Sequence, residues 1–191
     1  MADKQKQIND LKTEIAEKQF EERVLHIDRV ARVVKGGRRF RFRALVVVGD
    51  KKGRVGVATA KGADVTSAVS KAVDVAKKNM QDITIYNGTF PHEAEESVSG
   101  ARILLRPAAP GTGLIAGGAV RVVLEIAGVQ NALSKSLGSS NKLNIAYATL
   151  KALKSMKPAS EWVTRQGSSS TTAKKKTESK PATETKKKAS K

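Results

Sequence analysis

Hydrophobic and polar side chains alternate over residues 39–46, with the period of a β-strand that has two unlike faces. One face carries Arg39, Arg41 and Arg43, and the other carries Phe40, Phe42, Ala44 and Val46. The pattern predicts that this strand lays its aromatic side chains on a core and presents a row of guanidinium groups to solvent.

Two more β-rich runs flank this strand. Residues 22–34 precede it and are joined to it by Lys35-Gly36-Gly37-Arg38, where the two glycines can supply the positive φ of a hairpin turn. Residues 49–53 form a second tight turn, which leads into a strand over residues 54–60. Small side chains at alternate positions of that third strand favour close packing of a helix; they are Gly56, Ala58 and Ala60.

A helix is predicted over residues 64–80, where apolar side chains recur at helical spacing. Asp64 suits the N-cap position, and Lys77 and Lys78 suit the negative C-terminal end of the helix. We therefore expect a first domain over residues 23–88, made of a three-stranded antiparallel sheet and one helix.

The pattern changes after residues 89–99, where Pro91 and clustered acidic residues indicate a linker. Strands are predicted at residues 102–105 and 131–138, and they alternate with helices at residues 117–128 and 141–156. This gives a small β-α-β-α domain over residues 100–157, so the fold class of the chain is α+β. An N-terminal extension (residues 1–22) and a disordered lysine-rich tail (residues 158–191) complete the predicted organisation.

Charge changes the functional picture, because the chain has a formal net charge of +18. Residues 23–62 hold twelve basic residues against two acidic ones, a net charge of +10. Such concentration points to a polyanionic partner, nucleic acid first and an anionic membrane surface second. No apolar run reaches the roughly 18 residues of a membrane span, and the polar N-terminus is unlike a signal peptide. We expect a soluble intracellular protein with no membrane partner.

The basic residues of the first domain are candidates for binding RNA phosphates, which guanidinium groups hold in bidentate fashion. No exposed aromatic platform is evident, so we expect recognition of RNA backbone and shape rather than of bases. The alternative is that the arginines only line a solvated sheet face. The candidates are Arg29, Arg32, Lys35, Gly36, Gly37, Arg38, Arg39, Arg41, Arg43, Lys51, Lys52 and Arg54.

Enzymatic motifs are few. Gly111–Ala116 fits a dinucleotide fingerprint, but Pro107 and Pro110 stretch the turn and Glu125 lies too close to serve as the ribose-binding acid. A loop that packs its backbone against protein or RNA is the better interpretation. His92 beside three glutamates could suggest a metal site, although solvated carboxylates in a linker explain them more simply. The chain has no cysteine, and we expect no enzymatic activity, cofactor or metal.

A family resemblance follows from residues at fixed spacing in both halves. In the first half these are Gly37-Arg38, Phe42, Ala44, Val47-Val48-Gly49-Asp50, Gly53, Val55-Gly56 and Ala58. In the second half the run PGTGLIAGGAVRVVLEIAGVQNALSKSLGSSN carries the similarity. Over residues 22–157 the chain resembles ribosomal protein five of the small subunit, bacterial type.

The resemblance implies a double-stranded-RNA-binding-like first domain that lacks its first helix, and a structural role in the cytoplasmic small ribosomal subunit. It implies contacts with small-subunit rRNA, with ribosomal proteins four and eight, and with mRNA at the entry channel, and an influence on decoding accuracy. Gly100 and Arg102 match positions at the contact with protein four, and the hairpin over residues 30–39 matches one beside the spectinomycin site. An enzyme that uses the Gly111–Ala116 loop is one competing class, and a free RNA chaperone or double-stranded-RNA binder is another.

Overall fold

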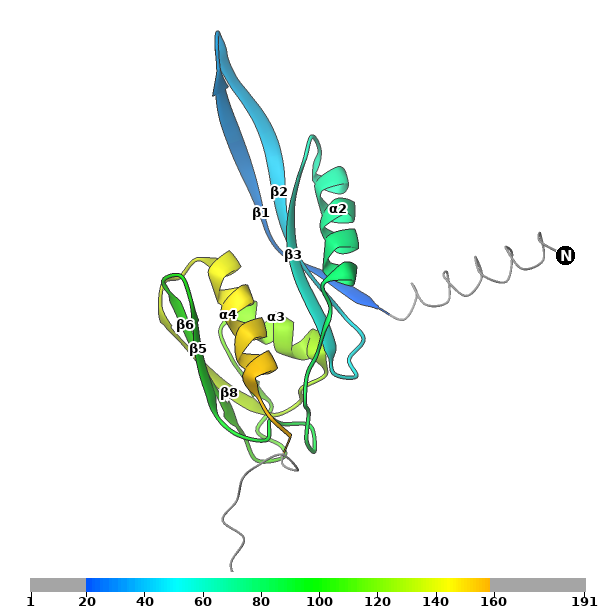
Figure 1. Ribbon diagram of the computed structural model, residues 1–191, viewed down its shortest axis with the longest axis vertical. Coiled ribbons are helices and arrows are strands. Elements are labelled where there is room, and N and C mark those ends of the chain that lie inside the picture. The colour runs from blue at the N-terminus through cyan, green and yellow to red at the C-terminus, as the bar shows by residue number, and fades with distance from the viewer. Residues whose placement is uncertain (1–19, 159–191) are drawn as a thin grey trace, which may run out of the picture.

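The first half of the chain is a four-stranded antiparallel sheet with a helix on one face (Figure 1). The structure is a computed structural model that describes residues 20–158. Its first elements are β1 (Glu21–Val34), β2 (Gly37–Gly49), β3 (Arg54–Gly62), α2 (Val65–Lys78) and β4 (Gln81–Asp82), and the strand order is β1-β2-β3-β4. The predicted sheet and helix are confirmed, and a fourth strand of two residues is added.

The second half is another four-stranded sheet, covered on one face by two helices (Figure 1). Its elements are β5 (Ala94–Val98), β6 (Ala101–Pro107), β7 (Leu114–Ile115), α3 (Gly118–Ala127), β8 (Ala132–Gly138) and α4 (Lys142–Ser155), in the strand order β5-β6-β8-β7. The two predicted strands and two predicted helices lie within two residues of their expected bounds. The predicted α+β class is confirmed.

The stretch predicted as a linker is partly a strand. β5 pairs antiparallel with β6 over its whole length, and Phe90 is only 2% exposed. The clustered acids concealed this strand, since their carboxylates are held by basic side chains of neighbouring elements. The N-terminal extension and the lysine-rich tail lie outside the described residues, apart from residues 20–22 and Pro158, and β1 begins at Glu21. The domain boundaries stay a prediction.

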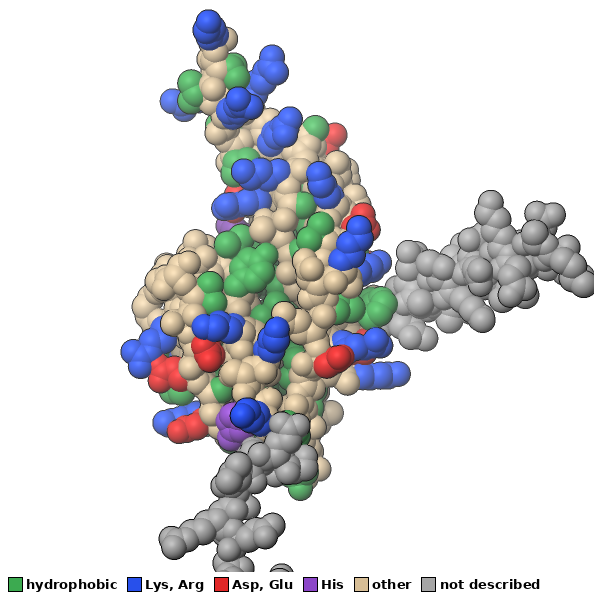
Figure 2. All heavy atoms as spheres, viewed as in Figure 1, with side chains coloured by type: hydrophobic (Ala, Val, Ile, Leu, Met, Phe, Trp, Pro, Cys, Tyr) green, Lys and Arg blue, Asp and Glu red, His purple; other side chains and the backbone are tan. Residues whose placement is uncertain are grey.

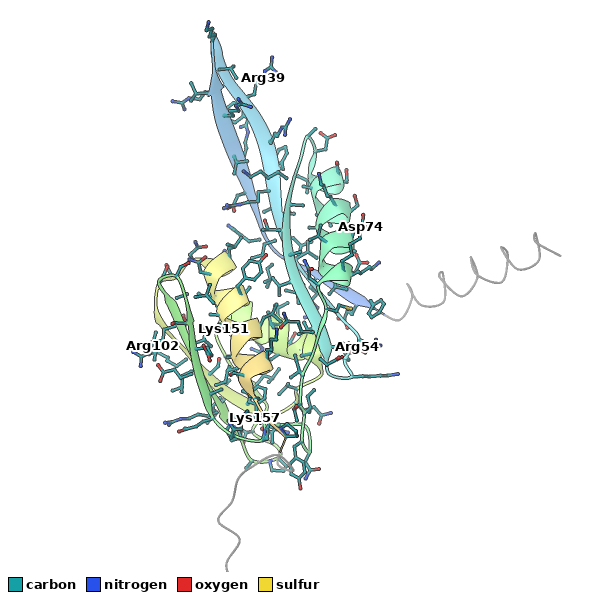
Figure 3. The ribbon with its side chains drawn as sticks, viewed as in Figure 1. Arg39, Arg54, Asp74, Arg102, Lys151 and Lys157 are labelled. Atoms are coloured by element: carbon teal, nitrogen blue, oxygen red, sulfur yellow. The ribbon has the colours of Figure 1, made fainter. Side chains whose placement is uncertain are left out.

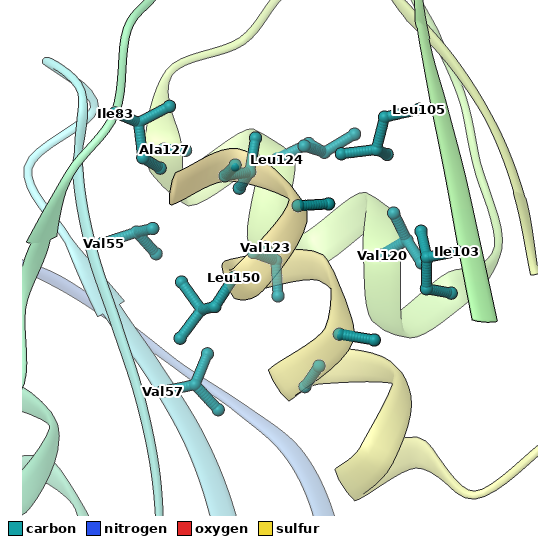
Figure 4. Close-up of a cluster of buried hydrophobic side chains, with 14 of the residues drawn as sticks. Val55, Val57, Ile83, Ile103, Leu105, Val120, Val123, Leu124, Ala127 and Leu150 are labelled. Carbon is teal, nitrogen blue, oxygen red and sulfur yellow. The ribbon is translucent and has the colours of Figure 1, made fainter. Parts of the chain in front are cut away.

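Both faces of the first sheet are covered between Ala44 and Val48 of β2. Ala44, Val46 and Val48 of β2 pack with the buried alanines of α2, which agrees with the predicted helix contact. Leu45 and Val47, on the opposite face, belong to the core that the second half builds around α3 and α4 (Figure 4). The larger core therefore runs without interruption from the first sheet to the second.

Helix α2 approaches β3 closely because the facing residues are small. A Cβ atom on Gly56 would lie 2.3 Å from the Ala76 carbonyl oxygen. Asp64 occupies the predicted N-cap position of α2, but its side chain accepts no capping hydrogen bond. Among residues 20–158, no helix is long and apolar enough to cross a membrane.

Candidate nucleic-acid interface

The β1–β2 hairpin projects well beyond the rest of the molecule (Figure 1). β3 pairs with β2 only as far as Phe42, which lies opposite Gly62. Among the described residues, β1 is therefore the only strand that neighbours residues 37–41. At the turn Gly36 has φ +87° and Gly37 has φ +152°, and no atom lies within 4 Å of a Cβ built on either. The turn therefore needs glycine for its backbone conformation, and its surroundings are open.

Strand register sorts the hairpin side chains onto two faces. Arg32 lies opposite Arg39, and Val30 lies opposite Arg41; this side is named the arginine face. Phe40 lies opposite Ala31 on the other side, together with Ile27, Arg29, Val33 and Arg38, and this side is named the aromatic face.

Phe40 is 49% exposed, so the prediction that it packs on the core is wrong. Phe42 does pack against the core under α2. The difference arises because β3 pairs no further along β2 than Phe42, so Phe40 has no third strand beside it.

A cleft of about 250 Å³ on the arginine face gathers four cations. Arg32, Arg39, Arg41 and Lys61 line it, together with Val30, Ala31 and Val34, and this surface is named the arginine groove. Within residues 20–158 no carboxylate forms an ion pair with any of the four. Figure 2 shows basic side chains along the whole hairpin. Uncompensated like charges at this spacing repel one another, and a phosphate would relieve that repulsion.

Arg43 differs from its neighbours because it already has an acidic partner. Its Nη2 donates to Asp28 Oδ2 over 2.7 Å, and this hydrogen bond lowers the pKa of the Asp28 carboxyl. His26 Nε2 lies 2.9 Å from the other carboxylate oxygen, and Lys142 Nζ donates to His26 Nδ1 over 3.2 Å. These contacts run from Arg43 through Asp28 and His26 to Lys142, and they connect the base of the hairpin to the start of α4.

Three of the predicted RNA-binding cations lie at the far end of the sheet, whereas Arg29, Lys35 and Arg38 lie on the hairpin or at its turn. Between Arg39 and Gly49 the strand covers about 34 Å at its usual rise, so Lys51, Lys52 and Arg54 are remote from the arginine groove. Figure 3 shows Arg39 near the hairpin tip and Arg54 at the opposite end of the sheet. Arg54 pairs with Asp50 and Lys51 pairs with Glu21. The predicted set is thus divided into two groups.

The loop after β2 joins the two halves of the molecule. The Asp50 side chain, 5% exposed, accepts hydrogen bonds from the backbone N–H groups of Lys52 (2.8 Å) and Arg54 (3.0 Å). Burial raises the pKa of Asp50, but these two hydrogen bonds, together with the hydrogen bond and charge of the Arg54 side chain, outweigh it and hold the pKa below its ordinary value.

The same loop hydrogen-bonds to the end of α3. Lys51 N donates to Ile126 O and Gly53 N donates to Ala127 O, each over 3.0 Å. A Cβ on Gly128 would lie 2.1 Å from the Lys51 carbonyl oxygen. The sequence offered only a tight turn here, and nothing in it predicted the contact with α3.

The glycine loop at residues 111–116 is held by a side chain that the sequence analysis missed. Asn131 Oδ1 accepts hydrogen bonds from Gly111 N and Gly113 N, each over 3.0 Å. A dinucleotide site would need such N–H groups for its phosphates. Both N–H groups already donate to Asn131, so they are not free to bind a phosphate. The interpretation of this loop as one that packs its backbone against protein or RNA stays a prediction.

The acidic residues around β5 each contact a different cation. Glu93 lies 3.1 Å from Arg106, Glu96 lies 2.9 Å from Lys151, and Glu95 pairs with Arg102. The part of the chain that the structure describes holds no group of three His, Cys, Asp or Glu residues placed to bind a metal. Arg102, with a raised pKa from its Glu95 hydrogen bond, follows the exposed turn at Gly100, and Figure 3 shows it on the outside of the second sheet.

Comparison with known proteins decides the family. Residues 20–84 match the model of the ribosomal protein S5 N-terminal domain, and residues 96–165 match that of the ribosomal protein S5 C-terminal domain. The chain belongs to the ribosomal protein S5 family. The resemblance seen in the sequence is confirmed, and the two sheets with their helices are the two domains of an S5 protein.

The sequence identity to a small-subunit protein supports the same family assignment. Small ribosomal subunit protein uS5c of Spinacia oleracea is 56% identical to the chain over 143 residues, which is 74% of this chain and 46% of the relative. The chain thus spans about half the length of this S5 relative.

Proposed function

We propose that the chain is a structural constituent of the small ribosomal subunit in the cytoplasm, without enzymatic activity, and that it binds rRNA through the β1–β2 hairpin. The observation that carries the proposal is the arginine groove at the projecting hairpin, whose four cations have no carboxylate partner within residues 20–158. Membership of the S5 family supports the choice of rRNA over other polyanions.

The salt dependence of rRNA binding tests the proposal. Changing Arg32, Arg39 and Arg41 together to Gln should flatten the slope of log K against log salt by about 0.9 for each lost phosphate contact in a duplex. Binding of the full chain to small-subunit rRNA would be measured across a salt series.

The matched control changes Arg102, Arg106 and Arg121 to Gln. It removes the same charge, but all three side chains are ion-paired and lie outside the hairpin. This variant should keep the parental slope. Equal slopes for the two triple variants would show that only net charge matters, and the hairpin assignment would then be abandoned.

Contacts with other components form the second part of the proposal. We propose that Gly100 and Arg102 meet ribosomal protein four, that protein eight is a further neighbour, and that the protein supports subunit assembly, the mRNA entry channel and decoding accuracy. The exposure of Gly100 and Arg102 supports the contact with protein four, and membership of the S5 family supports the other parts. Arg102→Glu should raise misreading in a reporter strain while the protein still co-sediments with small subunits. If the wild-type protein sediments away from the small subunits, a free RNA-binding protein would be favoured instead.

A further inference from the structure

We infer that the aromatic face of the hairpin binds one unpaired nucleobase of the RNA by stacking against Phe40 and Arg29. The inference rests on the proposed function, because it assumes that the hairpin meets RNA. It adds a base contact to the phosphate contacts of the arginine groove. The sequence predicted no exposed aromatic platform, but the half-exposed Phe40 ring with Arg29 over it forms one.

Exposed apolar side chains gather on the aromatic face. Of the seven large hydrophobic side chains that are exposed within residues 20–158, three lie here: Ile27 (41%), Phe40 (49%) and Val33 (75%). Figure 2 shows hydrophobic side chains among the basic ones at the hairpin tip. A projecting hairpin that bound only phosphates would need no apolar side chains there, so this surface indicates a partner with an apolar plane.

Arg29 and Phe40 form a stacked pair on this face. The guanidinium carbon of Arg29 lies 3.8 Å from the centroid of the Phe40 ring. No carboxylate of the described residues forms an ion pair with Arg29. Aromatic rings and guanidinium planes are the surfaces on which proteins stack unpaired RNA bases. A base added to this pair extends a stack that the protein has already begun.

The two faces together select an unpaired nucleotide rather than a duplex. Beyond Phe42 no described strand pairs with the free edge of β2, so a nucleic-acid backbone held in the arginine groove has an open path round that edge. A nucleotide could then keep its phosphate on one face and place its base on the other. A paired base cannot do so, because its planes are covered by the base pairs above and below it.

Two RNA hairpins of one sequence test the inference, one fully paired and one with a single bulged adenosine. The full-length protein should bind the bulged RNA more tightly. Phe40→Leu keeps an apolar side chain but removes the ring, and it should weaken binding of the bulged RNA about 5- to 150-fold, the range that 1–3 kcal/mol per stacked base implies. Binding of the paired RNA should change less than twofold, and Phe40→Trp should retain the preference for the bulge.

A fluorescent readout separates stacking from a general effect. With 2-aminopurine at the bulge, wild-type protein should quench the fluorescence and Phe40→Leu should not. The inference is overturned if Phe40→Leu weakens both RNAs equally, or neither. The proposed function fails differently, since then the Arg32, Arg39 and Arg41 triple variant would leave both affinities unchanged. Equal melting temperatures would confirm that Phe40→Leu is folded, as expected for a half-exposed side chain beyond the core.

Discussion

Arg41 and Arg43 lie two positions apart on the same face of one strand, yet within residues 20–158 only Arg43 has a carboxylate partner. Strand pairing decides this, since Asp28 lies opposite Arg43 and Val30 lies opposite Arg41. The alternation of side chains along one strand predicts the face on which each arginine lies. It does not predict the partner across the ladder, which depends on the register set by the turn at Gly36 and Gly37.

Single substitutions should distinguish these two arginines. Arg41→Gln should flatten the salt slope of rRNA binding by nearly one unit if it contacts one phosphate. Arg43→Gln should flatten it by clearly less, because that guanidinium is hydrogen-bonded to Asp28. Salt titrations of both variants give the comparison, and an equal change in slope would mean that Arg43 leaves Asp28 when RNA binds.

Substitution of Asp50 should lower the free energy of unfolding more than substitution of any exposed acidic residue. Asp50→Asn weakens the two backbone hydrogen bonds in a loop that joins both halves, and it should lower the free energy of unfolding by about 1–3 kcal/mol. The control is Glu93→Gln, whose exposed ion pair with Arg106 should contribute less than about 1 kcal/mol. Urea denaturation measures both, and a similar loss for the two variants would contradict the structural role of Asp50.

The pH dependence of stability should follow from the same carboxyl. The pKa of folded Asp50 lies below the ordinary value of 3.8, so its stabilising contribution is present above about pH 4. That contribution is lost as the pH falls through the lowered pKa. Asp50→Asn should therefore show a smaller loss of stability between pH 5 and pH 2 than the parent, in urea titrations at each pH.

Among the secondary-structure elements, length and environment decided which were predictable. The long strands and the helices carry enough periodic positions to be placed within a few residues. β4 and β7 have only two residues each, too few for any period to show. β5 was mistaken for a linker because its carboxylates, which pair with other elements, looked like a solvated acidic run.

The candidate site was predicted less completely than the fold. The basic hairpin and its glycine turn could be placed from sequence. The exposure of Phe40 could not, because it depends on where β3 ends beside the hairpin. The separation of Lys51, Lys52 and Arg54 from the other cations follows from the length of β2, whereas the sequence shows only that they are close along the chain.

The packing of α2 on β3 gives a prediction at this scale. Gly56→Ala places a Cβ against the Ala76 carbonyl and should push α2 away, at a cost of about 1–3 kcal/mol for an overpacked contact. Gly118→Ala is the control, since no atom lies within 4 Å of a Cβ at that helical position. Thermal melts should show a clear loss for the first variant and none for the second. Equal melting temperatures would mean that α2 can shift freely.

On the scale of the whole molecule, the two family domains share one core. Val55 and Val57 of β3, like Leu45 and Val47 of β2, are buried against the second half. At about 1.5–3 kcal/mol for each buried side chain, these four contribute about 6–12 kcal/mol, which is comparable to the 5–15 kcal/mol stability of a typical domain.

A fragment of residues 20–84 should therefore not fold stably alone, although a family domain ends there. The chain with both halves should unfold in one cooperative transition, followed by circular dichroism during heating. The fragment should show no cooperative melt and should bind a hydrophobic dye. A sharp melt of the fragment would show that the shared core is dispensable for the first sheet.

The shared core also has a consequence for the order in which the chain is synthesised. A ribosome makes β1, β2 and β3 first, but α3 and α4, which cover their second face, end at Ala127 and Ser155. At about 5–20 residues per second, α4 is complete roughly 5–20 s after β3. Until α3 is complete, about 3–13 s after β3, Leu45, Val47, Val55 and Val57 lack both of the helices that cover them in the folded chain. During synthesis, each new copy of this protein must therefore expose an apolar, aggregation-prone sheet face for several seconds before the segment that covers it has been made.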